Sequence, residues 1–305
     1  MFMQLLVGGV SMGLLFALVA IEYTLIWNSC GLLNFAHGQM IMVGAYIFGG
    51  TLVLGLGTSY LMGWIGTLAI VMILGVVLAF IIFIPLKDLG SLYAIIATMM
   101  FGMVITNSVT LIWGNYPFFV TGYLSGAYRI GSVSVTKAYL FIIIVAVIVV
   151  AALLWFMHFT KTGRAMRCVS ENKAMSAMVG INVRANMVIT ITISCIICAI
   201  VGMLAAPLLS ITTNMGNTIS TKGFIAAILG GFGSVPGAVL GGILVGVIEN
   251  IATMFIPSVY KDITSFVILI AVILVKPSGL LGSGKVKMTG KSRGEESREK
   301  GRVIF

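Results

Sequence analysis

Long, uninterrupted apolar runs constrain the fold of this chain more than any other feature. One of them extends from Leu140 to Phe156 without a charged residue, and 60% of the 305 residues are hydrophobic while 9% are charged. Several windows reach the roughly 20 apolar residues that cross a hydrocarbon core. Strands of a membrane β-barrel alternate over about 10 residues instead. The sequence therefore predicts an all-α, polytopic integral membrane protein with about seven to nine transmembrane helices.

The basic residues are concentrated in two segments. Eight of the 18 lie at or beyond Lys276, and five lie between Lys161 and Arg184. This clustering is typical of cytoplasmic segments next to membrane spans, so the net charge of +10 indicates lipid contact and not a nucleic-acid partner. We therefore expect a membrane domain over 1–282 and a basic cytoplasmic tail over 283–305 that is disordered or associated with the membrane surface. The first apolar run lacks a convincing cleavage site, which favours a retained helix.

Apolar length and turn residues place the individual spans. They are expected at 5–27, 31–54, 61–84, 92–113, 138–159, 187–209 and 263–275. The turn-rich segment 114–136 is expected to be an outer loop, and 212–222 a short polar loop. If 161–184 and the tail are both cytoplasmic, 224–256 crosses twice or not at all. A re-entrant half helix plus one short span, or a tight hairpin, would satisfy that count, which also places the N-terminus outside.

Polar side chains interrupt the second apolar run. Asn34, His37 and Gln39 lie there among glycines, and polar groups at membrane depth are costly unless they face a cavity or one another. Glu22, inside the first span, is the most costly residue to bury, so we expect it to face the protein interior or a neighbouring polar group such as Asn34 or His37. These four residues are our first candidates for a translocation path.

A second interrupted segment lies in the other half of the chain. Seven glycines fall between 230 and 246, and we assign Gly231 and Gly233 to the same path. Paired interruptions indicate a discontinuous or re-entrant segment in each half, and hence a pseudo-repeat with a transport path between the halves. Glycine used only for close helix packing is the alternative, and it fits the second segment better than the first.

The basic segment 160–184 contains a short helix candidate. The run 170–179 has a possible N-cap in Ser170 and an apolar face, and Gly180 would end the helix. Such a helix suits docking into a groove on a partner protein. The alternative is a helix that lies on anionic lipid, attracted through Arg164 and Arg167.

Four stretches in series resemble the permease subunits of branched-chain amino-acid ABC importers. They are LLNFAHGQMIMVGAY from Leu32, GRAMRCVSENKAMSAMVGINV from Gly163, FIAAILGGFGSVPGAVLGGILVGVIE from Phe224 and KPSGLLG from Lys276. The resemblance runs from the first span to Gly282 and implies a multi-pass protein of the bacterial inner membrane. It also implies a second similar permease, two cytoplasmic ATP-binding subunits and an extracytoplasmic substrate-binding protein as partners.

The same resemblance implies that the basic loop docks on the ATPase. The residues of this sequence that it assigns to docking are Gly163, Arg164, Arg167, Glu171, Ala174, Ala177 and Gly180.

No group of residues in the sequence suggests catalysis or a metal. Cys195 and Cys198 form a CxxC inside an apolar run, where packing is the expected role. Residues 279–285, GLLGSGK, begin like a phosphate-binding loop, but Val286 stands where a Ser or Thr must hold magnesium. We therefore expect no enzyme activity and no cofactor on this chain, with ATP bound by the partner subunits.

Three other functions stay open at this stage. A self-sufficient secondary transporter or channel for a small polar solute could use Glu22 or Glu249 as an ion-coupling carboxylate. An importer of the same family could carry urea or short amides. A membrane scaffold is disfavoured by the two glycine-broken segments.

Overall fold

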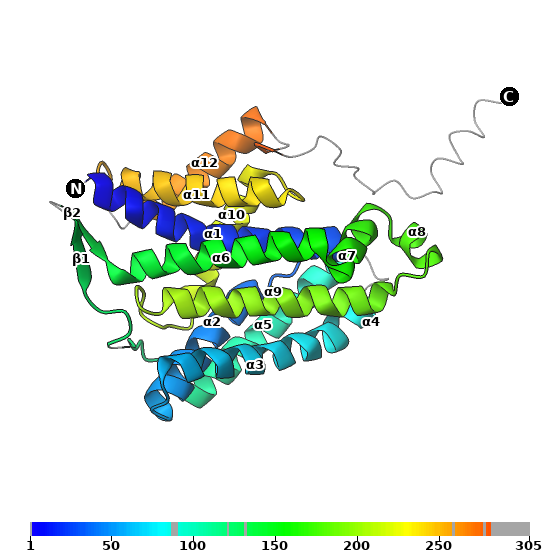
Figure 1. Ribbon diagram of the computed structural model, residues 1–305, viewed down its shortest axis with the longest axis horizontal. Coiled ribbons are helices and arrows are strands. Elements are labelled where there is room, and N and C mark those ends of the chain that lie inside the picture. The colour runs from blue at the N-terminus through cyan, green and yellow to red at the C-terminus, as the bar shows by residue number, and fades with distance from the viewer. Residues whose placement is uncertain are drawn as a thin grey trace.

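The computed structural model describes residues 2–86, 91–120, 122–130, 133–257, 260–276 and 279–281. Within them the chain forms a bundle of helices aligned along one direction (Figure 1). The expected tail, 283–305, lies outside the described residues, as does Gly282. In chain order the elements are α1 (Phe2–Cys30), α2 (His37–Ala45), the π-helix η1 (Tyr46–Gly55), α3 (Tyr60–Leu78), the π-helix η2 (Ala79–Phe83), α4 (Ile84–Leu86), α5 (Ser91–Trp113), β1 (Ala127–Ile130), β2 (Val133–Thr136), α6 (Lys137–Phe159), α7 (Lys161–Glu171), α8 (Lys173–Met178), α9 (Val183–Ala205), α10 (Met215–Gly230), α11 (Val235–Ala252) and α12 (Lys261–Val275).

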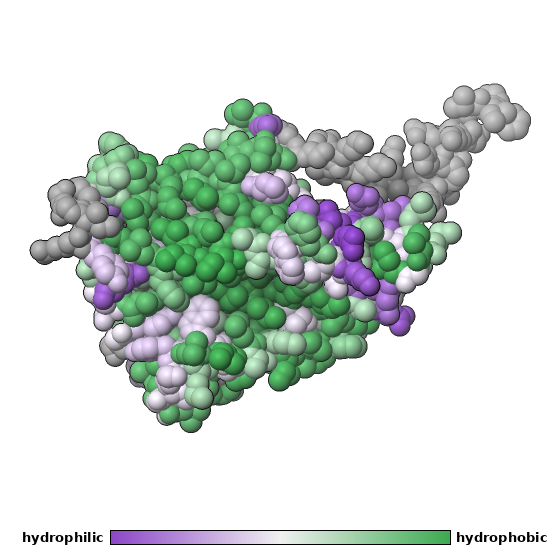
Figure 2. Space-filling model, viewed as in Figure 1, coloured by the Kyte–Doolittle hydropathy of each residue, from purple (hydrophilic) through white to green (hydrophobic). Residues whose placement is uncertain are grey.

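Seven helical segments of the described chain are long and apolar enough to cross a membrane. Their outward surface is a broad apolar band, flanked by polar residues around α7 and α8 (Figure 2). The prediction of an all-α, multi-pass membrane protein is confirmed. The segments are Phe2–Cys30, His37–Gly55, Tyr60–Leu86, Leu92–Trp113, Lys137–Phe159, Val183–Ala205 and Val235–Ala252.

Three expected boundaries are wrong. The second helix begins at His37 and not near Gly31, because 31–36 is not helical. The sixth span begins at Val183, where Asn182 caps it, and ends at Ala205. The polar stretch 212–222 is not simply a loop, since α10 starts at Met215. The polar residues of this stretch line cavities inside the bundle. The sequence prediction was wrong because a polar composition alone is also typical of a surface loop.

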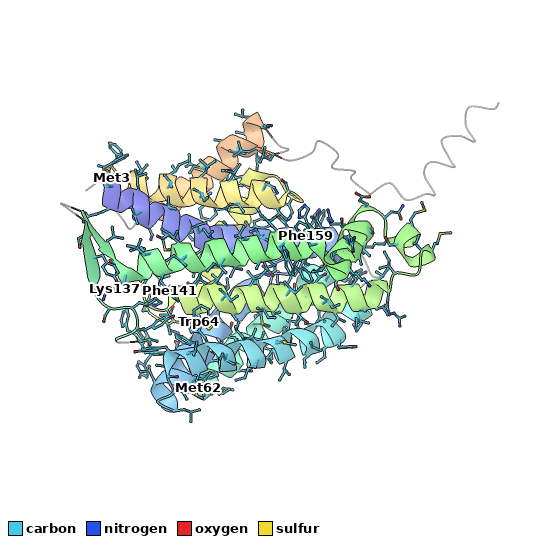
Figure 3. All side chains as sticks on the ribbon, in the orientation of Figure 1. Met3, Met62, Trp64, Lys137, Phe141 and Phe159 are labelled. Carbon is cyan, nitrogen blue, oxygen red and sulfur yellow. The ribbon has the colours of Figure 1, made fainter. Side chains whose placement is uncertain are left out.

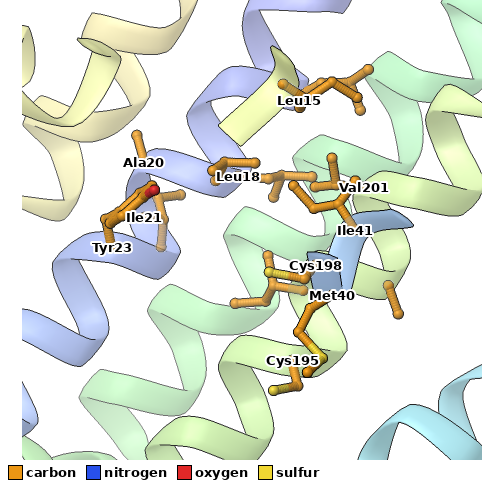
Figure 4. Packing of buried hydrophobic residues seen from close by; sticks show 14 of the residues in the cluster. Leu15, Leu18, Ala20, Ile21, Tyr23, Met40, Ile41, Cys195, Cys198 and Val201 are labelled. Atoms are coloured by element: carbon orange, nitrogen blue, oxygen red, sulfur yellow. The ribbon is translucent and has the colours of Figure 1, made fainter. Parts of the chain in front are cut away.

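Helices α1, α2 and α9 form the centre of the core. Leu15, Leu18 and Ile21 of α1 pack toward α2 and α9, and all three are fully buried (Figure 4). Cys195 and Cys198 of α9 are also buried in this core as free thiols, as the packing interpretation of the CxxC predicted.

Backbone contact between α1 and α11 replaces side-chain packing at one seam. A Cβ on Gly13 would lie 2.8 Å from the Cα of Ile243, and a Cβ on Gly246 would overlap the backbone of Gly13. Small residues of this kind let membrane helices approach closely. Aromatic contacts hold other helices, such as Trp64 of α3 and Phe141 of α6, whose ring centroids are 6.0 Å apart (Figure 3).

The segment 114–136 lies at the end of the bundle opposite α7 and α8 (Figure 1). It contains the antiparallel hairpin β1–β2, in which Ala127 pairs with Thr136. Tyr123 anchors it by accepting a hydrogen bond from Trp64 Nε1 at 2.8 Å, and burial raises the pKa of Tyr123 to about 12. The first turn of α1 lies at this same end, so the start of α1 is at the opposite end of the bundle from the basic loop (Figure 1).

Candidate functional site: a cavity between α2, α5 and α10

Two helices of the bundle begin in its interior and meet there. The chain leaves α1 at Cys30, continues without helix through 31–36, and starts α2 at His37. It likewise leaves α9 at Ala205 and starts α10 at Met215 after a non-helical return. The first turns of α2 and α10 are in backbone contact, because a Cβ on Gly38 would lie 3.0 Å from the amide nitrogen of Asn217. The helix starts of two broken segments therefore converge.

The second interruption is not where the sequence placed it. Phe224 to Gly230 continue α10, and 231–234 is a tight turn between α10 and α11. Gly231 and Gly233 of that turn have φ of 99° and 96°, which favours glycine, and Asn28 Nδ2 donates to the Gly233 carbonyl at 3.0 Å. The two glycines therefore shape a turn at the α7/α8 end, and the true break is 206–214. Between them, α10 and α11 form the hairpin that the crossing count allowed.

A cavity of about 650 Å³ lies where α2, α5 and α10 meet. One part of its lining is polar and uncharged, with amides and hydroxyls from α2, α5 and α10. The other part is apolar, with aromatic and methionine side chains. The lining residues are Tyr23, Phe35, Gln39, Met99, Met103, Thr106, Asn107, Asn217, Ser220, Thr221 and Phe224.

Six residues were predicted to line the path, and the structure describes all six. Of these six, Gln39 alone lines this cavity. Its Nε2 donates to Asn217 Oδ1 at 3.1 Å, which joins α2 to α10 across the lining. Asn34 is buried but does not line the cavity, and its Oδ1 accepts a hydrogen bond from the amide of Ala36 at 2.9 Å, which shapes the backbone. Next to it, the amide of Phe35 donates to Thr98 Oγ1 of α5 at 3.1 Å.

Glu22 and His37 form a buried pair behind the cavity wall. His37 Nδ1 contacts Glu22 Oε1, and Ser194 Oγ of α9 donates to the same oxygen. This confirms the expected contact between Glu22 and His37. The ring of Tyr23 stands edge-on to His37, with centroids 4.1 Å apart, and separates the pair from the cavity. The pair therefore joins α1, α2 and α9.

The same cluster contains metal-ligand atoms. Glu22, His37 and Cys198 each bring one such atom within 4.8 Å of the others. Glu22 Oε1 is already engaged by His37 and Ser194, so an ion could enter only if these contacts opened. The observed arrangement is a polar tie between helices.

Sequence reasoning missed the α5 and α10 side of the cavity. Thr106 and Asn107 lie in a span whose other polar residues, such as Ser108 and Thr110, do not line the cavity. Asn217 and Thr221 lie in the stretch taken for a loop. The signal was present, because Asn217, Thr221 and Phe224 follow a helical spacing of four and three residues.

Glu249 belongs to a second buried charge cluster. Lys222 Nζ of α10 lies 2.5 Å from Glu249 Oε1 of α11 and 2.8 Å from Asp262 Oδ1 of α12. Ser265 Oγ adds a hydrogen bond to Glu249 Oε2 at 3.3 Å. Because a buried lysine neutralises Glu249, this carboxylate is a poor candidate for reversible ion binding. The cluster instead ties α10, α11 and α12 together beside a smaller cavity of about 280 Å³.

The basic loop folds into two helices. Asn172 caps α8, and its Oδ1 accepts from the amide of Met175 at 3.1 Å. The predicted cap Ser170 lies instead in the last turn of α7 and donates to the Arg167 carbonyl. Both are capping residue types, so local sequence could not choose between them. Gly180 has φ of 89° and follows the end of α8, as expected.

An exposed apolar surface on α8 extends into the following turn. Met175, Met178 and Val179 are 61%, 83% and 81% exposed. Arg164, Arg167 and Glu171 are exposed on α7, and Ala177 on α8, whereas Gly163 is buried against Met157 and Ala174 lies within α8. This combination of apolar and charged surface lies outside the apolar band (Figure 2).

Comparison with known proteins identifies the family. The family model described as "Branched-chain amino acid transport system / permease component" matches residues 5–273. The chain is 32% identical to the high-affinity branched-chain amino acid transport system permease protein LivH of Salmonella typhimurium, over 94% of this chain and 97% of that one. It is 31% identical to LivH of Escherichia coli K12 and to BraD of Pseudomonas aeruginosa, with the same coverage. No solved structure matches. The chain belongs to the family of permease components of branched-chain amino-acid transport systems.

Proposed function

We propose that this chain forms one wall of the path through which an ABC importer passes branched-chain amino acids or closely related small solutes. The observation that carries the proposal is the cavity at the meeting point of the two broken segments. A cavity of about 650 Å³ falls within the range of small-molecule sites. Half-helix starts near the middle of a membrane protein are typical of transport paths.

The lining of the cavity suits a small amphipathic solute. Amide and hydroxyl groups such as Gln39, Asn107 and Asn217 can hydrogen-bond the ammonium and carboxylate groups of an amino acid. Met99, Met103 and the aromatic rings can contact a branched aliphatic side chain. The lining side chains carry no formal charge, which favours brief contacts over tight retention, as passage requires. Urea or short amides would leave the apolar part unused.

The partners follow from the same proposal. The two exposed methionines of α8 would dock on one of two ATP-binding subunits, a second similar permease would complete the path, and a separate binding protein would deliver the solute. ATP would then be bound and hydrolysed outside this chain. Residues 280 and 281 donate hydrogen bonds to the carbonyls of Leu229 and Gly230, so the described chain ends at the α7/α8 end. We assign that end to the cytoplasm, with the C-terminus.

The assembled complex provides the direct test. The chain is purified from its native membrane with its partners, placed in proteoliposomes, and assayed for ATP-dependent uptake of radiolabelled leucine with urea and acetamide as competitors. Co-purified ATPase subunits and leucine uptake would support the proposal. Gradient-driven uptake by the chain alone would support the secondary transporter instead, and competition by urea or acetamide would reassign the substrate.

Blocking the cavity is expected to stop transport without preventing assembly. Thr106→Trp places a large side chain in the cavity, and we expect leucine uptake to fall about tenfold or more. Thr110→Trp is the matched control, because Thr110 lies one turn further along α5, bonds its i−4 carbonyl as Thr106 does, and is not part of the lining. Equal uptake by the two variants would remove the cavity from the path.

A charge on the α8 surface is expected to prevent docking. Met178→Asp changes a side chain that is 83% exposed, so the fold should be preserved while ATPase co-purification is lost. Gly180→Trp should act in the same direction by adding bulk at the end of α8. Ser170→Asp, on the exposed side of α7, is the control. ATPase retained by Met178→Asp would assign α8 to the lipid surface.

A further inference from the structure

Lys173 joins the docking helix to the membrane bundle. It is the first residue of α8, and its Nζ donates to the carbonyl oxygen of Cys30, the last residue of α1. An ammonium at this position complements the partial negative charge at a helix C-terminus. In the described part of the chain, no other side chain of α8 hydrogen-bonds a membrane-spanning helix. This contact therefore links α8 directly to the end of α1.

The contact lies at the point where the chain turns back into the bundle. Gly31 follows Cys30 with φ of 62°, and a Cβ there would lie 3.4 Å from Lys173 Nζ. The non-helical segment 31–36 then leads to the start of α2. Phe35 of this segment lines the large cavity. Lys173 thus lies at one end of a short connection whose other end lies at the cavity wall.

The rest of the α1 terminus is firmly held. Ser29 Oγ and Thr190 Oγ1 of α9 are hydrogen-bonded at 2.8 Å, and Asn186 Nδ2 donates to Ser29 Oγ at 3.1 Å. Asn28 is bonded to the turn between α10 and α11. Beyond this end, the segment 31–36 is non-helical and is held by the hydrogen bonds from the Phe35 amide to Thr98 Oγ1 and from the Ala36 amide to Asn34 Oδ1. It is the segment that we expect to adjust when the position of Lys173 changes.

We infer that Lys173 is the coupling residue of this permease: it transmits displacement of α8 to the segment 31–36 and thereby repositions Phe35 at the cavity. The inference rests on the proposed function, because it needs α8 to dock on an ATPase. Lys173 is a positioning residue that does not contact the solute. The coupling requires a hydrogen-bond donor at the end of the Lys173 side chain. Without that donor, ATP binding to the partner no longer changes the position of Phe35 at the cavity.

Cysteine labelling at Phe35 tests the inference without requiring a known substrate. Phe35→Cys is made in a Cys168→Ser background, since Cys168 is the exposed thiol among four cysteines, and the complex is treated with N-ethylmaleimide with and without ATP and vanadate. We expect the labelling rate to change about threefold or more on nucleotide trapping, and the change to disappear in Lys173→Met. Lys173→Arg should keep it, because arginine retains the donor.

Lys161→Met is the matched control, since it removes an exposed lysine from the start of α7 instead of α8. Three results would overturn the inference: no nucleotide effect at Phe35→Cys in the otherwise unaltered complex, the same effect in Lys173→Met, or loss of ATPase from the Lys173→Met complex, which would make Lys173 an assembly residue. Failure of the proposed function is a different result, because the unaltered chain would then purify without any ATPase.

Discussion

Gly216→Ala is expected to prevent the membrane domain from reaching its native packing. A methyl group at Gly216 would overlap the carbonyl oxygen of Gly38, at the contact where α10 and α2 begin. Backbone cannot yield as a flexible side chain can, so the two helix starts would have to separate. We expect a loss of about 3 kcal/mol or more in the free energy of unfolding, at the upper end of overpacking effects.

Denaturant titration in detergent, followed by tryptophan fluorescence, measures that loss. Gly8→Ala is the matched control, because Gly8 lies in α1 and a Cβ there would meet Tyr139 Cζ at an ordinary 3.7 Å. The control should unfold at the midpoint of the unaltered chain or slightly above it, because alanine favours a helix more than glycine does. If Gly216→Ala does so as well, α2 and α10 do not meet as described.

Breaking the Glu22–His37 pair is expected to have an effect of similar size. Glu22→Leu leaves the imidazole of His37 buried without its carboxylate partner and the hydroxyl of Ser194 without its acceptor. Removal of one member of a buried pair typically costs about 3–5 kcal/mol, much of it from the partner left behind. His37→Leu leaves the carboxylate unpaired and should be at least as harmful. We expect lower uptake in both variants because less folded complex is present.

The double variant Glu22→Leu/His37→Leu tests whether the two residues stabilise the fold as an interacting pair or independently of each other. If the residues act as a pair, the double variant should lose clearly less stability than the sum of the single variants, with a coupling of about 1 kcal/mol or more. Additive losses would contradict the pairing. Glu171→Gln serves as the control for removing a carboxylate, because Glu171 is exposed on α7.

Part of the candidate site could be predicted from the sequence, and part could not. The cost of burying a charged group in a membrane, which is a local argument, predicted a polar neighbour such as Asn34 or His37 for Glu22, and in the structure this neighbour is His37. Whether a polar residue faces a cavity or supports its wall depends on neighbouring helices. For that reason Gln39 lines the cavity, while Asn34 and His37, only a few residues away, lie behind it.

Apolar length alone determined the class of the protein and most of its spans, because in lipid every backbone polar group must be satisfied within its own helix. Charge and helix-forming residues likewise located the basic loop and the helix α8, whereas α7 before it was not expected. The tertiary structure decided where the second interruption lies, that the starts of α2 and α10 meet, and that Lys222 neutralises Glu249. These features join residues far apart in the chain, and composition or spacing within one segment carries no information about which distant segment it will contact.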